Sequence, residues 1–249
     1  AAIAVLDLHR KARSLLVRTK RYAELEDKLL AALAPPALCR RFLQGEHVVH
    51  NGIKEGTAMF TYLVGYDDMA LRYAASECIA WVNMIFCLLD ACTTQSGSVT
   101  KVETFNNFLL AFSGELETAD EPADEALDGQ HAERCMALAV QMLQATAHVR
   151  RPDGKVTTVK VGLSSGAICA GVICGLASPR YSIFGDTVNT ASRMASTSIQ
   201  CTASNAFVHI SPSSRSLLGP QTESEWLRRI GPGMEIVPRE SLTDVKGKG

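Results

Sequence analysis

Two different spacings of apolar residues divide the chain. In residues 1–33, which contain neither Gly nor Pro, apolar side chains recur every seven positions, as in a helix with a coiled-coil seam. Pro35 and Pro36 end this helix, and residues 37–43 form one more short helix. A helix lying on its own domain and a two-chain coiled coil fit the pattern equally well. The positions of the seam are Leu8, Leu15, Tyr22 and Leu29.

From residue 57 onward, short apolar runs alternate with longer helical patterns. A hairpin turn at Asn106 and Asn107 joins the second predicted strand to the third. The resulting order β-α-β-β-α-β is the ferredoxin-like arrangement, which predicts an α+β fold whose sheet carries helices on one face. This fold alone indicates no chemistry. The expected strands are 58–64, 98–103, 108–112, 156–163 and 167–176, and the expected helices run from about 68 to 93 and from about 131 to 149.

The composition is that of a globular protein. Of the 249 residues, 47% are apolar and 20% are charged, and the net charge of -1 gives no electrostatic reason to expect nucleic acid as a partner. The eight cysteines form no CxxC pair, which favours reduced thiols in a cytoplasmic compartment. The sequence predicts neither a membrane span nor a signal peptide in this stretch. A tether to a membrane protein, the cytoskeleton or a large assembly outside the stretch stays open.

The segment RYSIFGDTVNTASRM, residues 180–194, carries the strongest functional motif. Its pattern predicts a short strand at 181–184, a glycine turn with Asp186 as a capping carboxylate, and a helix from Thr187 to Ser196. On that helix Asn189 and Arg193 are four residues apart, so both side chains leave the same face. An amide and a guanidinium one turn apart can hold a sugar and a phosphate together. By spacing alone, the pair is also an ordinary surface pair.

The whole segment closely resembles the second signature of the class III nucleotide cyclases, the catalytic domains of guanylate and adenylate cyclases. The resemblance implies that Asn189 orients the ribose and that Arg193 stabilises charge at the α-phosphorus during cyclisation. It covers residues 29–249, most strongly 158–197. Residues 29–46 resemble the linker that joins upstream regions to cyclase domains. We therefore expect a piece of a larger protein, with a helical linker at 1–45 and a cyclase homology domain, lacking its last strand, at 46–249.

Three further positions match substrate-binding residues of the family. Glu103, in the phrase KVET, occupies the base-reading position of guanylate-type enzymes, where a carboxylate accepts from the N1–H and exocyclic amine of guanine. Ser182 falls at the companion base-reading position. Lys246, in the phrase VKGKG, resembles the lysine that reaches the β and γ phosphates. The alternatives are a solvent-facing carboxylate for Glu103 and a flexible basic terminus for Lys246. The resemblance implies GTP rather than ATP.

The family's two metal-binding aspartates are replaced in this chain. By resemblance to the phrases FxDIxGF and KVETxGD, Tyr62 and Asn107 stand at their positions. Neither side chain is negatively charged at neutral pH, so we predict that this chain alone binds no Mg²⁺ or Mn²⁺. Asp67 and Asp68 fall past the strand and are predicted to cap a helix start. Because metal ions supply several kcal/mol of charge stabilisation, the isolated chain is predicted to be inactive.

Two functions fit these observations. In the family, each active site lies between two cyclase domains and takes metal ligands from one chain and the Asn, Arg and base-reading residues from the other. This chain is then the non-metal half of a heterodimeric guanylate cyclase, whose cyclase-type partner brings the aspartates and the Mg²⁺ or Mn²⁺ that convert GTP to cyclic GMP and diphosphate. The alternative is an inactive pseudo-cyclase, a structural or regulatory dimerisation module in a larger assembly.

Overall fold

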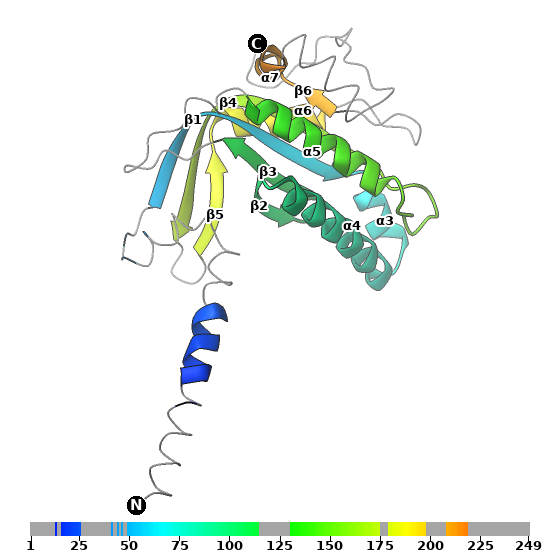
Figure 1. Ribbon diagram of the computed structural model, residues 1–249. Coiled ribbons are helices and arrows are strands. Elements are labelled where there is room, and N and C mark those ends of the chain that lie inside the picture. Colours follow the sequence, from blue (N-terminus) through cyan, green and yellow to red (C-terminus); the bar gives the residue numbers. More distant parts are fainter. Residues whose placement is uncertain are drawn as a thin grey trace, which may run out of the picture. The chain divides into compact units, whose positions relative to one another are not determined.

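The computed structural model (Figure 1) describes residues 13, 16–25, 41, 44, 46, 49–114, 130–174, 179–197 and 208–218. The chain divides into two compact units, Ala1–His50 with Gly171–Tyr181 and Asn51–Ala170 with Ser182–Gly249. In the first unit, residues 16–25 are helical and Tyr22 is exposed. The other seam positions, Leu8, Leu15 and Leu29, lie outside the described residues, so the coiled coil stays a prediction.

One mixed sheet positions the candidate site, and it confirms the predicted α+β fold. Its strands follow the order β2-β3-β1-β4-β5, with β6 paired in parallel to β4. The first four of these strands have the order of a ferredoxin-like core. The strands are β1 (Val49–Leu63), β2 (Thr100–Phe105), β3 (Phe108–Gly114), β4 (Val159–Cys174), β5 (Pro179–Phe184) and β6 (Val208–Ile210). The helices are α3 (Tyr66–Arg72), α4 (Ala75–Ser96), α5 (Gln130–Thr146), α6 (Asp186–Ser196) and α7 (Pro212–Leu217).

Three local predictions were wrong. The helix expected from 68 to 93 is two helices, because Tyr73 and Ala74 are extended and the Glu77 carboxylate accepts from the Ala74 N–H at 3.2 Å to start α4. The strands expected at 156–163 and 167–176 form one strand, since Gly166 adopts a φ of 150° that lets β4 continue. Asp186 does not cap α6: the N-cap residue is Gly185, and Asp186 lies in the first turn.

The main core lies between the sheet and the pair α4 and α5, which run side by side across one face of it (Figure 1). From β1, Met59 and Leu63 point into this core, and the Thr61 hydroxyl contacts the Met142 sulfur at 3.7 Å. Because side chains alternate along a strand, Phe60 and Tyr62 point to the opposite face. The candidate site is therefore built on the face that α4 and α5 leave uncovered.

Candidate functional site

Helix α6 rests on that opposite face, over β4. Val161 and Leu163 of β4 belong to the α4–α5 core, so Gly162 between them faces the other way. A Cβ added at Gly162 would overlap backbone atoms of Ala191 and Ala195, which means that the bare glycine lets the α6 backbone approach the strand closely. This contact fixes the height of α6 above the sheet.

The two signature residues of α6 lie where the sequence predicted them. Both fall inside the helix, with Asn189 exposed and Arg193 half-buried. The opposite side of the helix is buried and holds Val188, Ala191 and Ala195. The start of the helix is tied down where the Thr187 hydroxyl donates to the Ala167 carbonyl at 2.7 Å. The fold thus presents an amide and a guanidinium together from a fixed helix, and their roles toward nucleotide stay predictions.

The two expected metal positions are brought together. Tyr62 stands opposite Phe108 in the antiparallel pairing of β1 with β3, and the turn residue Asn107 immediately precedes Phe108. The Leu63 N–H donates to the Asn107 carbonyl at 2.7 Å, which joins the end of β1 to the β2–β3 turn. The two positions that the resemblance assigns to metal ligands are therefore adjacent, and neither carries a carboxylate.

Aromatic rings fill this place. The Tyr62 ring stacks on Phe60 with centroids 6.0 Å apart and an interplanar angle of 13°, and it meets Phe108 at 5.6 Å. Phe60 and Phe105 contact Phe108 as well, with centroids at 5.6 and 6.1 Å. We call these four residues, Phe60, Tyr62, Phe105 and Phe108, the aromatic cluster. The Tyr62 side chain is therefore part of the packing among these rings.

The Tyr62 hydroxyl reaches the signature helix. Its oxygen lies 3.1 Å from the hydroxyl oxygen of Ser192, the residue directly before Arg193 on α6. Sequence reasoning missed Ser192, because a serine within a helix gives no signal of a contact 130 residues away. The aromatic cluster did leave a signal, since aromatic residues flank both expected metal positions in the sequence.

These residues do not fit Mg²⁺ or Mn²⁺. Both ions prefer charged oxygen ligands, and the Tyr62–Asn107 position offers a phenol, an amide and aromatic rings. The nearby carboxylates Asp67 and Asp68 lie in the first turn of α3, and Asp68 pairs with Arg72 at 2.7 Å. In the described part of the chain no three His, Cys, Asp or Glu residues gather to hold a metal ion.

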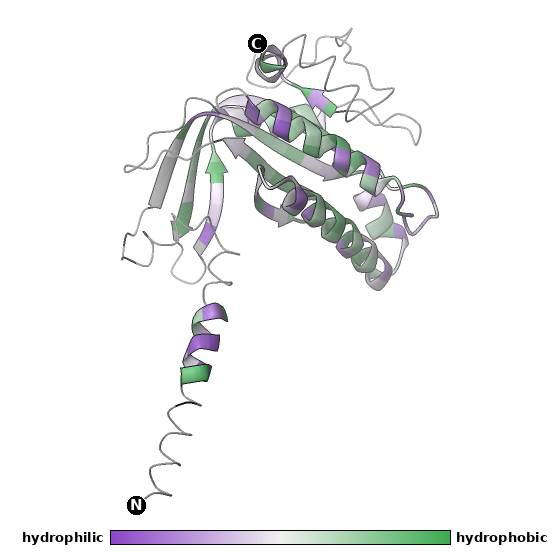
Figure 2. Cartoon of the chain, viewed as in Figure 1, coloured by the Kyte–Doolittle hydropathy of each residue, from purple (hydrophilic) through white to green (hydrophobic). Residues whose placement is uncertain are grey.

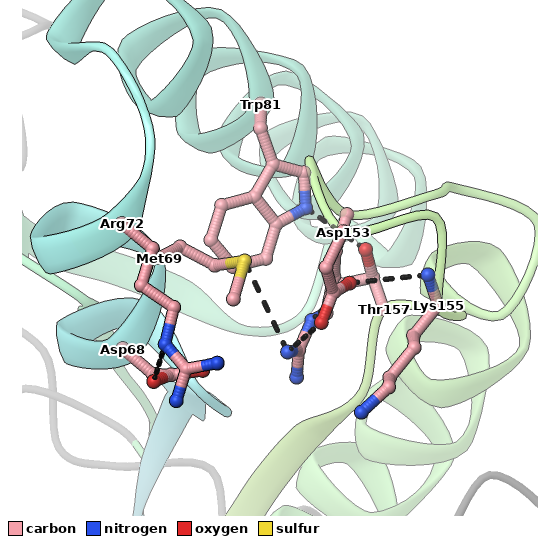
Figure 3. Close-up of polar contacts among 8 residues, drawn as sticks. Asp68, Met69, Arg72, Trp81, Asp153, Lys155 and Thr157 are labelled. Atoms are coloured by element: carbon pink, nitrogen blue, oxygen red, sulfur yellow. Dashed lines mark hydrogen bonds and ion pairs between the residues drawn. The ribbon is translucent and has the colours of Figure 1, made fainter.

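The turn that follows Tyr62 is braced by the loop between α5 and β4, part of which is drawn in Figure 3. Gly65 has a φ of 79°, and a Cβ placed there would lie 2.6 Å from Nη1 of Arg151. The Arg151 guanidinium donates to both oxygens of Asp153, and the Trp81 indole donates to the Thr157 hydroxyl at 2.9 Å. We call the Arg151–Asp153 pair, with exposed fractions of 12% and 15%, the loop brace.

The pKa of Asp153 reflects this arrangement. Burial by itself raises the pKa of the carboxyl, but the hydrogen bonds from Arg151 and the Lys155 N–H, together with both positive charges, lower it more. The net result is a pKa below the usual value of an aspartate. The loop brace is therefore an ion pair at neutral pH.

The predicted base-reading residues lie on different strands. Glu103 is half-buried on β2, directly after a register shift between Lys101 and Glu103, and a bulge of this kind re-aims a side chain. Ser182 is half-buried on β5, with β3, β1 and β4 between the two strands in the sheet order. Lys246 lies outside the described residues. The base-reading and phosphate roles stay predictions.

Comparison with known proteins matches residues 48–248 to the family described as adenylate and guanylate cyclase catalytic domain. Retinal guanylyl cyclase 2 of Bos taurus is 31% identical over 225 residues, which are 90% of this chain and 18% of that protein. Guanylate cyclase 2G of Mus musculus is 29% identical over 237 residues, 94% of this chain and 19% of that protein. The chain thus spans about a fifth of the length of these curated relatives.

Solved structures of guanylyl cyclase domains are also similar to this chain. The catalytic core of a rhodopsin-guanylyl cyclase with converted specificity, in complex with ATPalphaS, superposes with a TM-score of 0.61 at 26% identity, covering 80% of this chain and 93% of that one. The guanylate cyclase domain of RhGC from Catenaria anguillulae, in complex with GTP, has a TM-score of 0.56 at 28% identity, covering 68% and 84%. The adenylyl cyclase CyaB from P. aeruginosa, at 17% identity and a TM-score of 0.54, shares the fold.

Proposed function

Because the chain belongs to the adenylate and guanylate cyclase catalytic domain family, we propose that it supplies the base-, ribose- and phosphate-binding half of a guanylate cyclase site. A second cyclase-type domain supplies the metal-binding half, and the completed site converts GTP to cyclic GMP and diphosphate. One observation carries the proposal: the two metal positions, Tyr62 and Asn107, remain adjacent but lack carboxylates, while α6 presents Asn189 and Arg193 intact.

The chemistry of the retained half fits this role. The Arg193 guanidinium can stabilise negative charge that develops on a phosphate, and the Asn189 amide can hold a ribose hydroxyl. The Glu103 carboxylate matches two donors of guanine. The complex of the Catenaria anguillulae relative with GTP supports the choice of nucleotide. A non-canonical dimeric guanylyl cyclase domain of the RhoGC fusion protein from Blastocladiella emersonii, 29% identical with a TM-score of 0.54, supports pairing with another cyclase-type domain.

The metal and the setting follow from the same proposal. The partner holds the Mg²⁺ or Mn²⁺, because the Tyr62–Asn107 position offers no charged ligand. We further propose a cytoplasmic, reducing setting, with a tether to a membrane protein or large assembly. Free thiols in the described part of the chain support it, and they belong to Cys78, Cys87, Cys92, Cys135 and Cys169.

A complementation assay tests the proposal without the natural partner. The first chain is the wild type, which has the α6 residues and no metal ligands. The second carries Tyr62→Asp and Asn107→Asp to supply carboxylates, together with Asn189→Ala and Arg193→Ala to remove the α6 residues. Neither chain alone should form cyclic GMP from GTP with Mn²⁺, whereas the mixture should.

The matched control is the Tyr62→Asp, Asn107→Asp variant with α6 intact, which should be active by itself. Activity of this control together with an inactive mixture would contradict the half-site proposal. Formation of cyclic GMP by the wild-type chain alone would contradict it as well.

A second function, the pseudo-cyclase module, is favoured by one observation. Tyr62 is held by three contacts, ring contacts to Phe60 and Phe108 and a hydrogen bond with Ser192, which is the pattern of a residue that stabilises structure. Calorimetry of the wild-type chain with GTP and Mg²⁺, in the presence of the complementing variant, separates the two. Heat of binding supports the half-site, and its absence at millimolar GTP supports the module.

A further inference from the structure

Strand β6 brings a histidine to helix α6. In the parallel pairing of β6 with β4, His209 stands opposite Gly162. Val208 and Ile210 on either side of it pack against the α4–α5 core, so the His209 side chain points to the other face of the sheet, where α6 lies. Figure 2 shows hydrophilic and hydrophobic colours next to each other along β6. The strand therefore presents a half-buried imidazole to the helix that it contacts.

This imidazole binds the backbone of α6. Nδ1 of His209 lies 2.8 Å from the carbonyl oxygen of Met194. A carbonyl oxygen only accepts, so Nδ1 carries a hydrogen and donates it. The last four carbonyls of a helix have no partner within the helix, and Met194 is among the last four residues of α6. His209 therefore supplies a donor that the helix itself lacks.

The bond holds the turn that carries the signature arginine. Met194 directly follows Arg193, and the residue directly before it, Ser192, contacts the Tyr62 hydroxyl at 3.1 Å. β1, which contains Tyr62, lies next to β4 in the sheet, and β6 pairs with β4. Side chains from two strands thus hold the helix at the residue before Arg193 and at the residue after it.

The guanidinium of Arg193 is not held by a charged partner. The ion pairs among the residues that the structure describes use the side chains of Arg41, Arg72, Lys101 and Arg151, and none of them uses Arg193. The position of the guanidinium therefore depends on the backbone from which it extends. Because a misplacement of about 1 Å can cost a reaction a large factor in rate, the residues that hold this turn matter for chemistry.

We propose that His209 is a positioning residue for Arg193. The inference rests on the proposed function, in which the Arg193 guanidinium stabilises charge that develops on a phosphate during cyclisation. His209 acts through the last turn of α6 and not on the nucleotide. Since the position of the guanidinium matters most in the transition state, the loss of His209 lowers kcat and changes KM little.

A purely structural role is the alternative. Histidine side chains near the end of a helix can bind the last carbonyls and stabilise the helix without any part in a reaction. Such a role lowers the Tm, and it lowers activity only as far as folded chain is lost. Kinetic constants measured well below the Tm separate the two roles.

The complementing mixture tests the proposal. In the chain that has α6 intact, His209→Leu removes the donor and should lower kcat for cyclic GMP by about tenfold, while KM for GTP stays within about twofold. His209→Asn keeps a nitrogen donor at the δ position and should restore most of the kcat. His148→Leu, at an exposed position just past α5, is the matched control and should change neither constant.

A second background identifies the residue through which His209 acts. In a chain that already carries Arg193→Ala, His209→Leu should lower kcat no further, because the guanidinium that His209 positions is absent. A residue that supports the fold as a whole would lower the remaining activity by the same factor in both backgrounds.

Nuclear magnetic resonance of the isolated chain gives a measurement that is independent of activity. Order parameters of the Arg193 Nε–H and of the amides in the last turn of α6 should fall in His209→Leu and recover in His209→Asn. The amide of Thr187 should not change, since its hydroxyl still donates to the Ala167 carbonyl. If the wild-type mixture forms no cyclic GMP, the proposed function fails, and this measurement alone decides whether His209 positions Arg193.

Three outcomes would overturn the proposal. The first is an active mixture in which His209→Leu leaves kcat unchanged. The second is an equal loss of kcat from His209→Leu with and without Arg193→Ala. The third is a set of order parameters, at the Arg193 Nε–H and in the last turn of α6, that is the same in the wild type and in His209→Leu.

Discussion

The end of β1 and helix α6 face the same side of the sheet, yet they use their side chains in opposite ways. At the end of β1, Tyr62 is held by ring contacts and by a hydrogen bond to Ser192. On α6, Asn189 is exposed and Arg193 half-buried, and the packing of the helix depends on other residues. Residues that contribute to folding and residues that are available to a ligand are thus separated between the two regions.

The largest expected effect belongs to α6. Arg193→Ala should lower cyclic GMP formation in the complementing mixture by at least about a hundredfold, because a positioned charge donor for the transition state is lost. The free energy of unfolding should change by no more than about 0.5 kcal/mol. Ser196→Ala, at an exposed position on the same helix, is the control for activity. A stability loss as large as that of a core substitution would erase the distinction between the regions.

At the end of β1 we expect the opposite result, a loss of folding stability. Tyr62→Ala should cost about 2–3 kcal/mol of unfolding free energy, because the ring contacts with Phe60 and Phe108 are lost. Tyr62→Phe keeps the rings and loses only the hydrogen bond to Ser192, so it should cost about 1 kcal/mol. Urea denaturation measures both. Equal losses in the two variants would show that the rings contribute little.

The loop brace should give the smallest effect, with a distinctive pH dependence. Asp153→Asn should cost about 1 kcal/mol near neutral pH, since the hydrogen-bonded ion pair with Arg151 is lost. The pKa of Asp153 is lower in the folded chain than in the unfolded chain. The ionised carboxylate therefore contributes its full stabilisation at pH values above the unfolded pKa of about 3.9, and this stabilisation is lost as the pH falls through the folded pKa.

Urea midpoints of wild type and variant should therefore converge in acid. Asp68→Asn breaks an exposed pair with Arg72, whose exposed fraction is 70%, and should change the midpoint little at any pH. A constant difference between wild type and Asp153→Asn across the acid range would mean that Asp153 acts through packing and not through charge.

The sequence predicted what depends on local pattern. The hairpin at Asn106 and Asn107 is confirmed, and α6 begins one residue before its predicted start. The break at Tyr73 and Ala74 was missed, because a helical apolar pattern continues across it while the chain itself turns. The uninterrupted β4 was missed because a glycine between two apolar runs, here Gly166, is typical of a break between strands.

In the candidate site, too, the sequence predicted features that depend on local pattern and missed features that depend on tertiary packing. The resemblance assigned Tyr62 and Asn107 to the two metal positions, and their adjacency comes from the pairing of β1 with β3. The contact between Tyr62 and Ser192 depends on how far α6 approaches the sheet, which is set by the missing side chain of Gly162. Distances of this kind come from tertiary packing, and no local pattern contains them.

The hydrogen bond from the Leu63 N–H to the Asn107 carbonyl has an evolutionary consequence, because it uses backbone atoms only. It keeps the β1 end and the β2–β3 turn together whichever side chains they carry. In the genetic code the codons for Tyr, Asn and Asp differ only in the first base, so each position is a single nucleotide change from aspartate. The acidic pair that the resemblance implies is therefore a short mutational path away, on a backbone that holds the two positions together.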